Sequence, residues 1–213
     1  MTPPATARLA PPQSAVEVSR ETEHRLAAFA ALVAQWTPRI NLISPGSLPD
    51  IATRHIADSA QLLAFAPSAW SHWADLGSGA GFPGIVVAIL AAETNPAGRV
   101  TLVESDRRKA EFLRTVVRHL GLRADVSAAR AESLAPLGAD ILSARALAPL
   151  PQLLPLAFRH LAPGGRALFP KGRQATAELA AARTGPWRFA LLSHPSVTDP
   201  HARILQIEGL AHA

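Results

Sequence analysis

The segment Trp73-Ala-Asp-Leu-Gly-Ser-Gly-Ala-Gly-Phe-Pro-Gly84 predicts a buried strand, a glycine-rich turn and the start of a helix. The apolar residues up to Leu76 suit a short strand, and the run Ile85–Ala92 suits a buried helix. Pro83 fits the first helical turn, where the N–H that proline lacks would have no partner. A strand, turn and helix in this order bring backbone N–H groups and a helix N-terminus close to a ligand.

The glycines of this turn match two ligand-binding patterns. From Gly79 the sequence is Gly-x-Gly-x-x-Gly, the dinucleotide fingerprint; from Asp75 it is Asp-x-Gly-x-Gly-x-Gly, typical of S-adenosylmethionine (SAM) methyltransferases. Glu104 ends the next predicted strand, where a carboxylate binds ribose hydroxyls, and both ligands contain a ribose. Asp75 mildly favours SAM, because a carboxylate suits a cationic amino-acid group better than a pyrophosphate. A turn that binds nothing is the least favoured interpretation.

Composition limits the classes of protein to which the chain can belong. Its 213 residues, 48% of them hydrophobic, suffice for one large domain with an N-terminal addition. The absence of cysteine excludes disulfides, thiolate metal sites and a cysteine nucleophile, and we expect a cytoplasmic protein without a metal. The N-terminus lacks the apolar core of a signal peptide, and no run reaches the ~18 apolar residues of a membrane span. We therefore expect no membrane partner.

Arginine dominates the basic residues. The formal net charge is +5, and Lys109 and Lys171 are the only lysines among 21 basic residues. Arginine-rich codon usage and an anionic partner such as RNA explain this excess equally well. The run Arg107-Arg-Lys109 begins a predicted helix, where cations oppose the helix dipole. Such a run is usually a solvated face, but its place near the ligand edge also suits anion binding.

Three segments are expected: a disordered proline-rich arm (1–14), an N-terminal helical extension (15–66) and a ligand-binding α/β domain (67–213). In the extension, Pro38 is expected to stop or kink a first helix, and a second helix begins near Asp50. In the α/β domain, we expect a helix over Leu150–Leu161, broken at Pro155. Strands are expected at 73–76, 100–104, 124–127, 139–143, 166–169, 189–192 and 202–207. Their alternation with helices predicts a doubly wound, mostly parallel sheet that ends in an antiparallel hairpin.

The carboxyl ends of parallel strands share one edge of the sheet, where such sheets bind ligands. This edge collects Gly77, Ser78, Gly79 and Phe82 after the first strand, Glu104 after the second, Ala131 and Glu132 after the third, Arg145 after the fourth and Lys171 after the fifth. Phe82 could equally stack on an adenine or fill the core. His55 and Asp58, three residues apart on a predicted helix, are explained more simply by a local helix contact than by a polar patch facing the cleft.

These motifs together resemble the RsmG (GidB) family of bacterial SAM-dependent methyltransferases of small-subunit ribosomal RNA. The resemblance spans roughly residues 30–175. The most specific motifs are the Gly-Phe-Pro-Gly84 ending and Arg54-His-x-x-Asp-Ser59. The others are Trp36 to Leu42, Val103-Glu-Ser105 with Lys109 and Phe112-Leu113, Arg130-Ala-Glu132, Ser143 to Leu147, and Lys171-Gly172.

The resemblance implies a Rossmann-like methyltransferase fold for residues 67–213, SAM as cofactor, and methyl transfer to N7 of a guanosine in 16S (small-subunit) ribosomal RNA. It implies that SAM is bound by Asp75, Gly77, Ser78, Gly79, Phe82, Glu104, Ala131, Glu132 and Arg145, with Glu132 at the adenine and Glu104 at the ribose. Arg145 and Lys171 would be catalytic, and the RNA would be bound by Arg54, His55, Arg107 and Lys171. We expect a monomer that acts on 16S rRNA or on the small ribosomal subunit.

The residue chemistry agrees with guanine N7 as the acceptor. N7 has a free lone pair and no proton to lose, so positioning suffices and no general base is required. Without cysteine, the covalent route to C5 of a pyrimidine is excluded, and the Asn/Asp-Pro-Pro-aromatic motif of amine-methylating enzymes does not occur. Two alternatives stay open. An NAD-linked oxidoreductase would have to work without tyrosine, which the chain lacks, and a non-catalytic RNA-binding protein can be excluded only by activity.

Overall fold

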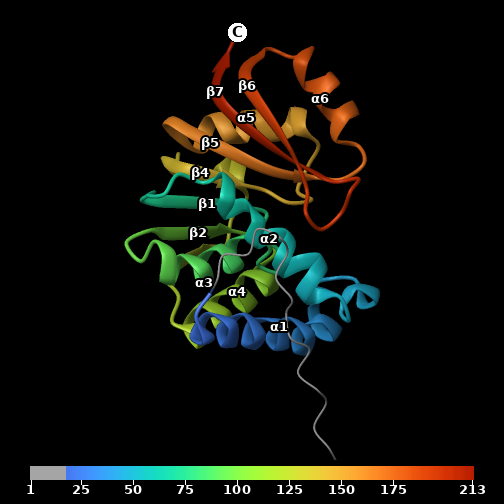
Figure 1. The fold of residues 1–213 in the computed structure, drawn as a ribbon. Helices are drawn as coiled ribbons and strands as arrows, with labels where there is room; N and C mark the ends of the chain where they lie inside the picture. Colours follow the sequence, from blue (N-terminus) through green and yellow to red (C-terminus); the bar gives the residue numbers. More distant parts are fainter. Residues whose placement is uncertain (1–17) are drawn as a thin grey trace, which may run out of the picture.

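The computed structural model describes residues 18–213, which form a seven-stranded sheet covered by helices on both faces (Figure 1). The expected disordered arm, residues 1–14, lies outside the described residues. The strands are β1 (His72–Leu76), β2 (Arg99–Val103), β3 (Ala124–Ser127), β4 (Ala139–Ser143), β5 (Leu161–Lys171), β6 (Trp187–Pro195) and β7 (Arg203–His212). Their order in the sheet is β3-β2-β1-β4-β5-β7-β6.

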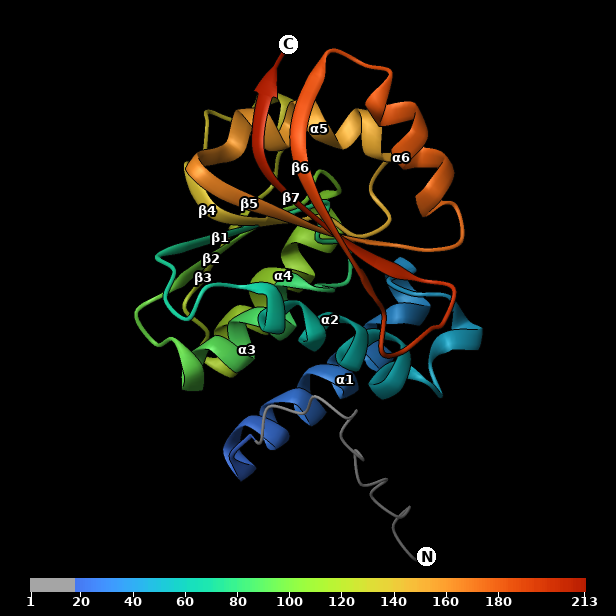
Figure 2. The same ribbon diagram turned by 45° about the horizontal axis from the view of Figure 1, so that its top comes forward.

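The helices fall into two layers. The main helices are α1 (Arg20–Ile40), α3 (Gly84–Thr94), α4 (Arg107–Leu120), α5 (Leu150–His160) and α6 (Ala175–Arg183). Short helical segments are η1 (Pro45–Ser47), η2 (Ile51–Ala57), α2 (Asp58–Ala60), η3 (Gln61–Phe65) and η4 (Ala131–Ser133). In Figures 1 and 2, α1, α3 and α4 lie on one face of the sheet, and α5 and α6 cover the other.

The sheet topology is the predicted one. β1 to β5 pair in parallel, whereas β7 pairs antiparallel with β5 and with β6. The doubly wound methyltransferase fold with a closing hairpin is therefore confirmed. The hairpin strands are longer than expected, because β6 and β7 extend to Trp187 and His212, where they still pair with each other.

The N-terminal helix α1 packs into the same apolar core as the sheet. Phe29 and Val33 of α1 are fully buried in one cluster with Ile85 of α3 and Phe112 of α4. Each of these side chains adds about 1.5–3 kcal/mol when it leaves water. Because this core contains both segments, the boundary predicted at residue 66 divides the chain by sequence pattern only, and the division into folding units stays a prediction.

Two prolines do not interrupt their helices as predicted. Pro38 lies inside α1, which continues to Ile40 and ends where Asn41 adopts a left-handed conformation. Pro155 lies inside α5, which continues to His160 and buries its apolar face against the sheet. In each case tertiary packing outweighs the loss of one backbone hydrogen bond.

Candidate functional site

A cavity of about 1260 Å³ opens at the carboxyl edge of the parallel strands. It exceeds the roughly 300–1,000 Å³ typical of a small-ligand site, so it has room for a cofactor and part of a second substrate. Nine of the predicted residues line it: Gly77, Ser78, Gly79, Phe82, Glu104, Arg145, Lys171, Arg54 and His55. The loops that follow β1, β2, β4 and β5 therefore meet at this edge, as predicted.

The glycine turn between β1 and α3 presents its backbone to the cavity. Gly77 has a φ of 66°, and a Cβ there would lie 2.6 Å from Leu147 Cδ1. Gly79 has a φ of 54°, and a Cβ there would have no protein atom closer than Gly77 O at 3.7 Å. Glycine is thus required at Gly77 by both conformation and space, and at Gly79 by conformation and by the open cavity it lines.

Glu104 supports this turn from the end of β2. Its Oε2 accepts a 2.8 Å hydrogen bond from the N–H of Gly79, and its Oε1 accepts a 2.7 Å bond from the N–H of Asp106. The carboxylate lines the cavity, and each oxygen has further lone pairs. Glu104 can therefore hold the turn and still accept a hydrogen bond from a ribose hydroxyl.

Asp75 lies beneath the turn and not on the cavity wall. The residue is fully buried, with Oδ1 accepting from the Ser143 hydroxyl at 2.7 Å and Oδ2 from the N–H of Gly84 at 3.2 Å. Burial raises the pKa of Asp75 to about 6, although hydrogen bonds from Ser143, Ser78 and Gly84 oppose the shift. The direct cofactor contact expected of Asp75 is therefore corrected: this carboxylate occupies the N-terminus of α3, where a dinucleotide would place its pyrophosphate.

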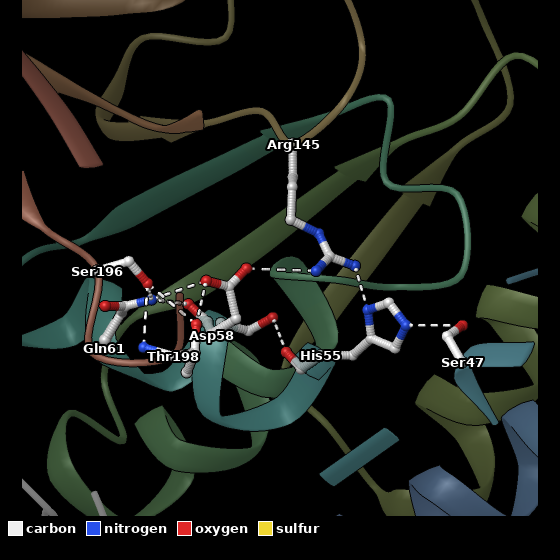
Figure 3. A network of polar contacts seen from close by, with 8 residues as sticks. Ser47, His55, Asp58, Gln61, Arg145, Ser196 and Thr198 are labelled. Atoms are coloured by element: carbon white, nitrogen blue, oxygen red, sulfur yellow. Dashed lines mark hydrogen bonds and ion pairs between the residues drawn. The ribbon is translucent and has the colours of Figure 1, made fainter. Parts of the chain in front are cut away.

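Arg145 is held by three side chains (Figure 3). Its Nη1 is 3.3 Å from Asp58 Oδ2, its Nη2 is 3.1 Å from His55 Nδ1, and its guanidinium lies 5.2 Å from the centre of the Phe82 ring. Asp58 and His55 are 87 and 90 residues away in the chain. The local helix contact favoured for His55 and Asp58 is therefore the wrong choice, since both side chains face the cleft and bind Arg145.

His55 is neutral at pH 7. Burial lowers its pKa from 6.5 to about 4, and the positive charges of Arg145 and Arg54 lower it further. Because Arg145 can only donate, Nδ1 of His55 must be the acceptor, and Nε2–H then donates to the hydroxyl of Ser47 at 3.2 Å. The ring therefore positions Arg145 and carries no charge of its own.

Phe82 belongs mainly to the core. It is 3% exposed, and its ring lies 5.1 Å from Phe29 and stacks on His55 at 5.0 Å. Of the two roles considered for this ring, the structure supports packing, with one edge on the cavity wall.

Lys171 reaches the cavity with its ammonium group already bound. Nζ donates to the carbonyl of Ala148 at 2.6 Å and pairs with Glu178 Oε2 at 2.9 Å. The same Glu178 oxygen accepts from the N–H of Leu150 at 2.8 Å. Lys171 therefore ties β5 to the start of α5 and to α6, and one of its three N–H groups is left for a substrate.

Three predicted residues lie off the cavity wall. Ala131 is buried in η4, and its carbonyl is 2.9 Å from Nε2 of His160, while Glu132 and Arg107 are exposed. Their roles as adenine and RNA ligands stay predictions.

The loop between β6 and β7 is the part of the site that was not predicted. Ser196, Thr198 and Asp199 line the cavity, as does Lys109 of α4. The predicted hairpin contained a signal for this loop: a strand antiparallel to β5 must begin at the carboxyl edge, so the loop before β7 has to lie there.

Within residues 18–213, no cluster of three or more His, Asp and Glu side chains is arranged to hold a metal. Over the same range, no helix combines the length and apolar character needed to cross a membrane.

A family model described as rRNA small subunit methyltransferase G (GidB) matches residues 22–199. The chain belongs to this family. A protein named ribosomal RNA small subunit methyltransferase G from Cereibacter sphaeroides is 54% identical over 197 residues, covering 92% of this chain and 95% of the relative. The protein of the same name from Paracoccus denitrificans is 51% identical and covers 93% of this chain and 100% of its own length.

Solved structures share the fold at low sequence identity. A mutant of MtNAS in complex with S-adenosylmethionine has a TM-score of 0.56 and 17% identity, covering 88% of this chain and 76% of that one. A SAM-dependent O-methyltransferase from Thermotoga maritima has a TM-score of 0.54 and 16% identity, covering 83% and 71%. Family membership decides between the two glycine patterns: the enzyme class is methyltransferase, the cofactor is SAM, and the NAD-linked alternative is discarded.

Proposed function

We propose that this methyltransferase transfers the methyl group of SAM to N7 of a guanosine in 16S rRNA. The observation that carries the proposal is the position of Arg145 after β4. It lies between the glycine turn of β1 and Lys171 of β5, on a cavity that all three line. The family name supplies the substrate class, and the cavity supplies a place where a cofactor and a nucleoside could meet.

The residues of the β1–β2 half fit SAM. The turn of Gly77 and Gly79 allows close approach of a ligand, and Glu104 can accept from the ribose hydroxyls. Ala131 and Glu132 would hold the adenine, and η4, which contains them, is anchored to α5 through His160. When bound, SAM supplies an electrophilic methyl group.

The residues at the boundary of the cavity position the acceptor without a base. His55 is neutral and bound to Arg145, and the carboxylate of Asp75 is sealed beneath the turn. Guanine N7 has no proton to remove, so what the site must provide is an in-line approach. Arg145 donates hydrogen bonds in a fixed fork, and it is held in place before the substrates arrive.

Cations at the mouth suit an RNA backbone. Arg54 and Lys109 line opposite sides of the cavity, on η2 and α4, and Arg107 lies one helical turn or less from Lys109. We propose that they bind phosphates around the target nucleotide. We further propose that the protein acts as a monomer in the cytoplasm and without a metal.

The proposal is tested by incubating the protein with methyl-labelled SAM and small-subunit rRNA, either naked or assembled into particles. We expect label in the RNA, and we expect calorimetry to show binding of SAM but not of NAD. Binding of SAM without transfer to either form of RNA would contradict the rRNA substrate and would favour the non-catalytic alternative.

A further inference from the structure

Asp58 divides its carboxylate between two parts of the site that are far apart in the chain (Figure 3). Oδ2 pairs with Arg145 at 3.3 Å, and Oδ1 accepts from the Thr198 hydroxyl at 3.1 Å and from Gln61 Nε2 at 2.8 Å. Asp58 and Thr198 are 140 residues apart in sequence. One half-buried carboxylate thus joins the loop after β4 to the loop between β6 and β7.

Gln61 adds a second attachment for the same loop. Its Oε1 accepts from the N–H of Val197 at 3.0 Å, and its Nε2 donates to the Ser196 hydroxyl at 3.2 Å. Ser196 and Thr198 also bond to each other at 3.0 Å. The segment 196–198 is therefore held in one position by two side chains of the N-terminal extension.

This loop forms the wall of the cavity furthest from the glycine turn. β4 and β5 lie between β1 and β7 in the sheet, and Thr198 and Asp199 line the cavity just before β7 begins. Lys171 pairs in register with Arg203, so the loop lies next to the lysine on the cavity edge. The half of the cavity that the glycine turn does not reach is bounded by this loop.

The loop suits a nucleoside better than a phosphate. Residues 196–202 are Ser, Val, Thr, Asp, Pro, His and Ala, without arginine or lysine. The exposed carboxylate of Asp199 would repel a phosphate, whereas hydroxyls and carboxylates accept hydrogen bonds from the N–H groups of a base.

We infer that Asp58 is a positioning residue that places Arg145 and the loop 196–202 at a fixed distance, and that this loop is the wall against which the target nucleoside of the RNA rests. The inference rests on the proposed function, because it assigns the second half of the same cavity to the RNA substrate. Asp58 itself touches neither substrate in this account; it acts through Arg145 and Thr198.

Thr198→Val tests the wall without touching Arg145. The substitution keeps the side-chain shape and removes one hydroxyl that donates to a carboxylate, so we expect the KM for the rRNA to rise about tenfold. The dissociation constant for SAM and the slope of RNA affinity against salt should stay unchanged, since neither the turn nor a cation is altered. Thr184→Val is the matched control, because its hydroxyl bonds only the carbonyl of Ala181 at the end of α6.

A double-mutant cycle tests the role of Asp58. Asp58→Ala should raise the KM for RNA and weaken SAM binding, and adding Thr198→Val to it should have no further effect on the KM. Gln61→Ala should reproduce the RNA effect alone, with SAM binding unchanged, and it serves if Asp58→Ala does not fold.

Two results would overturn the inference: Thr198→Val matching Thr184→Val, or the effects of Thr198→Val and Asp58→Ala multiplying in the double variant. Both require an active wild-type protein. If the wild type itself transfers no methyl to rRNA, the proposed function fails instead, so the two failures are distinguishable.

Discussion

Arg145 is the residue whose removal should separate activity from folding most clearly. Its side chain is 20% exposed and pairs with Asp58, which is 16% exposed. Arg145→Ala leaves that carboxylate without its cation, so we expect the free energy of unfolding to fall by about 1–3 kcal/mol. We expect kcat/KM to fall about 100-fold, because the substrates lose a fixed donor at the point where they meet.

Urea denaturation and methyl transfer measure these two effects. Arg118→Ala is the control, because Arg118 makes an exposed ion pair with Glu111 on α4, away from the cavity. Normal turnover by Arg145→Ala would refute the assignment of this arginine to the reaction site.

Asp75 and His55 should change the pH dependence of stability in opposite directions. The pKa of Asp75 is raised from 3.8 to about 6, so the folded protein binds this proton more tightly than the unfolded chain does. This carboxyl therefore lowers stability as pH rises through that window. The pKa of His55 is lowered from 6.5 to about 4, so the unfolded chain binds that proton more tightly, and stability is lost as pH falls from 6.5 towards 4.

We therefore expect Asp75→Asn to make the free energy of unfolding rise more steeply with pH between about 4 and 6, where the two windows overlap, and His55→Gln to make it rise less steeply. Urea denaturation at several pH values measures both slopes. Slopes that change in the same direction in the two variants would show that at least one of these pKa shifts is assigned to the wrong cause.

At the scale of the elements, the glycine turn gives a matched pair of substitutions. Gly79 and Gly121 both have a left-handed backbone, with φ of 54° and 61°, and neither leaves a Cβ in close contact with protein. Alanine at either position should lower the free energy of unfolding by about 1 kcal/mol. Only Gly79→Ala should also weaken SAM binding, because Gly79 lines the cavity and Gly121 ends α4.

Calorimetric titration with SAM distinguishes the two variants. Equal SAM affinities in Gly79→Ala and Gly121→Ala would place the cofactor away from the turn.

The elements that could be predicted are those whose pattern is local. The strand and turn from Trp73 to Gly84 and the amphipathic helix after Asp106 follow from hydrophobic period and capping. Pro38 and Pro155 were misjudged because apolar packing keeps both helices continuous, and packing is not visible in a local pattern.

The candidate site was predictable in its residues but not in its contacts. Alternation of strands and helices placed Gly77, Glu104, Arg145 and Lys171 at one edge, and the cavity contains all four. The pairing of Arg145 with Asp58 joins residues 87 apart, and no periodicity reports such a contact. The burial of Asp75 depends on Ser143 of the neighbouring strand, which is likewise invisible before the sheet order is known.

At the scale of the whole molecule, the arginine excess is a prediction about RNA. If Arg54 and Lys109 each bind a phosphate, removing either by alanine should reduce the slope of log affinity against log salt by about 1. Arg188→Ala on β6 is the control, since this exposed residue does not line the cavity. Filter binding to small-subunit rRNA over a range of salt concentrations measures the slope. An equal loss in all three variants would favour a diffuse charge effect over a defined contact surface.

The most direct test of the account is the chemical identity of the methylated nucleoside. Small-subunit rRNA treated with the wild-type protein and methyl-labelled SAM is digested to nucleosides and analysed by mass. We predict that the label is found in 7-methylguanosine, and that Arg145→Ala forms much less of it. Label in a methylated pyrimidine or in an exocyclic amine would contradict the central claim, because a cavity without a cysteine nucleophile or a free general base is suited to an acceptor that has no proton to lose.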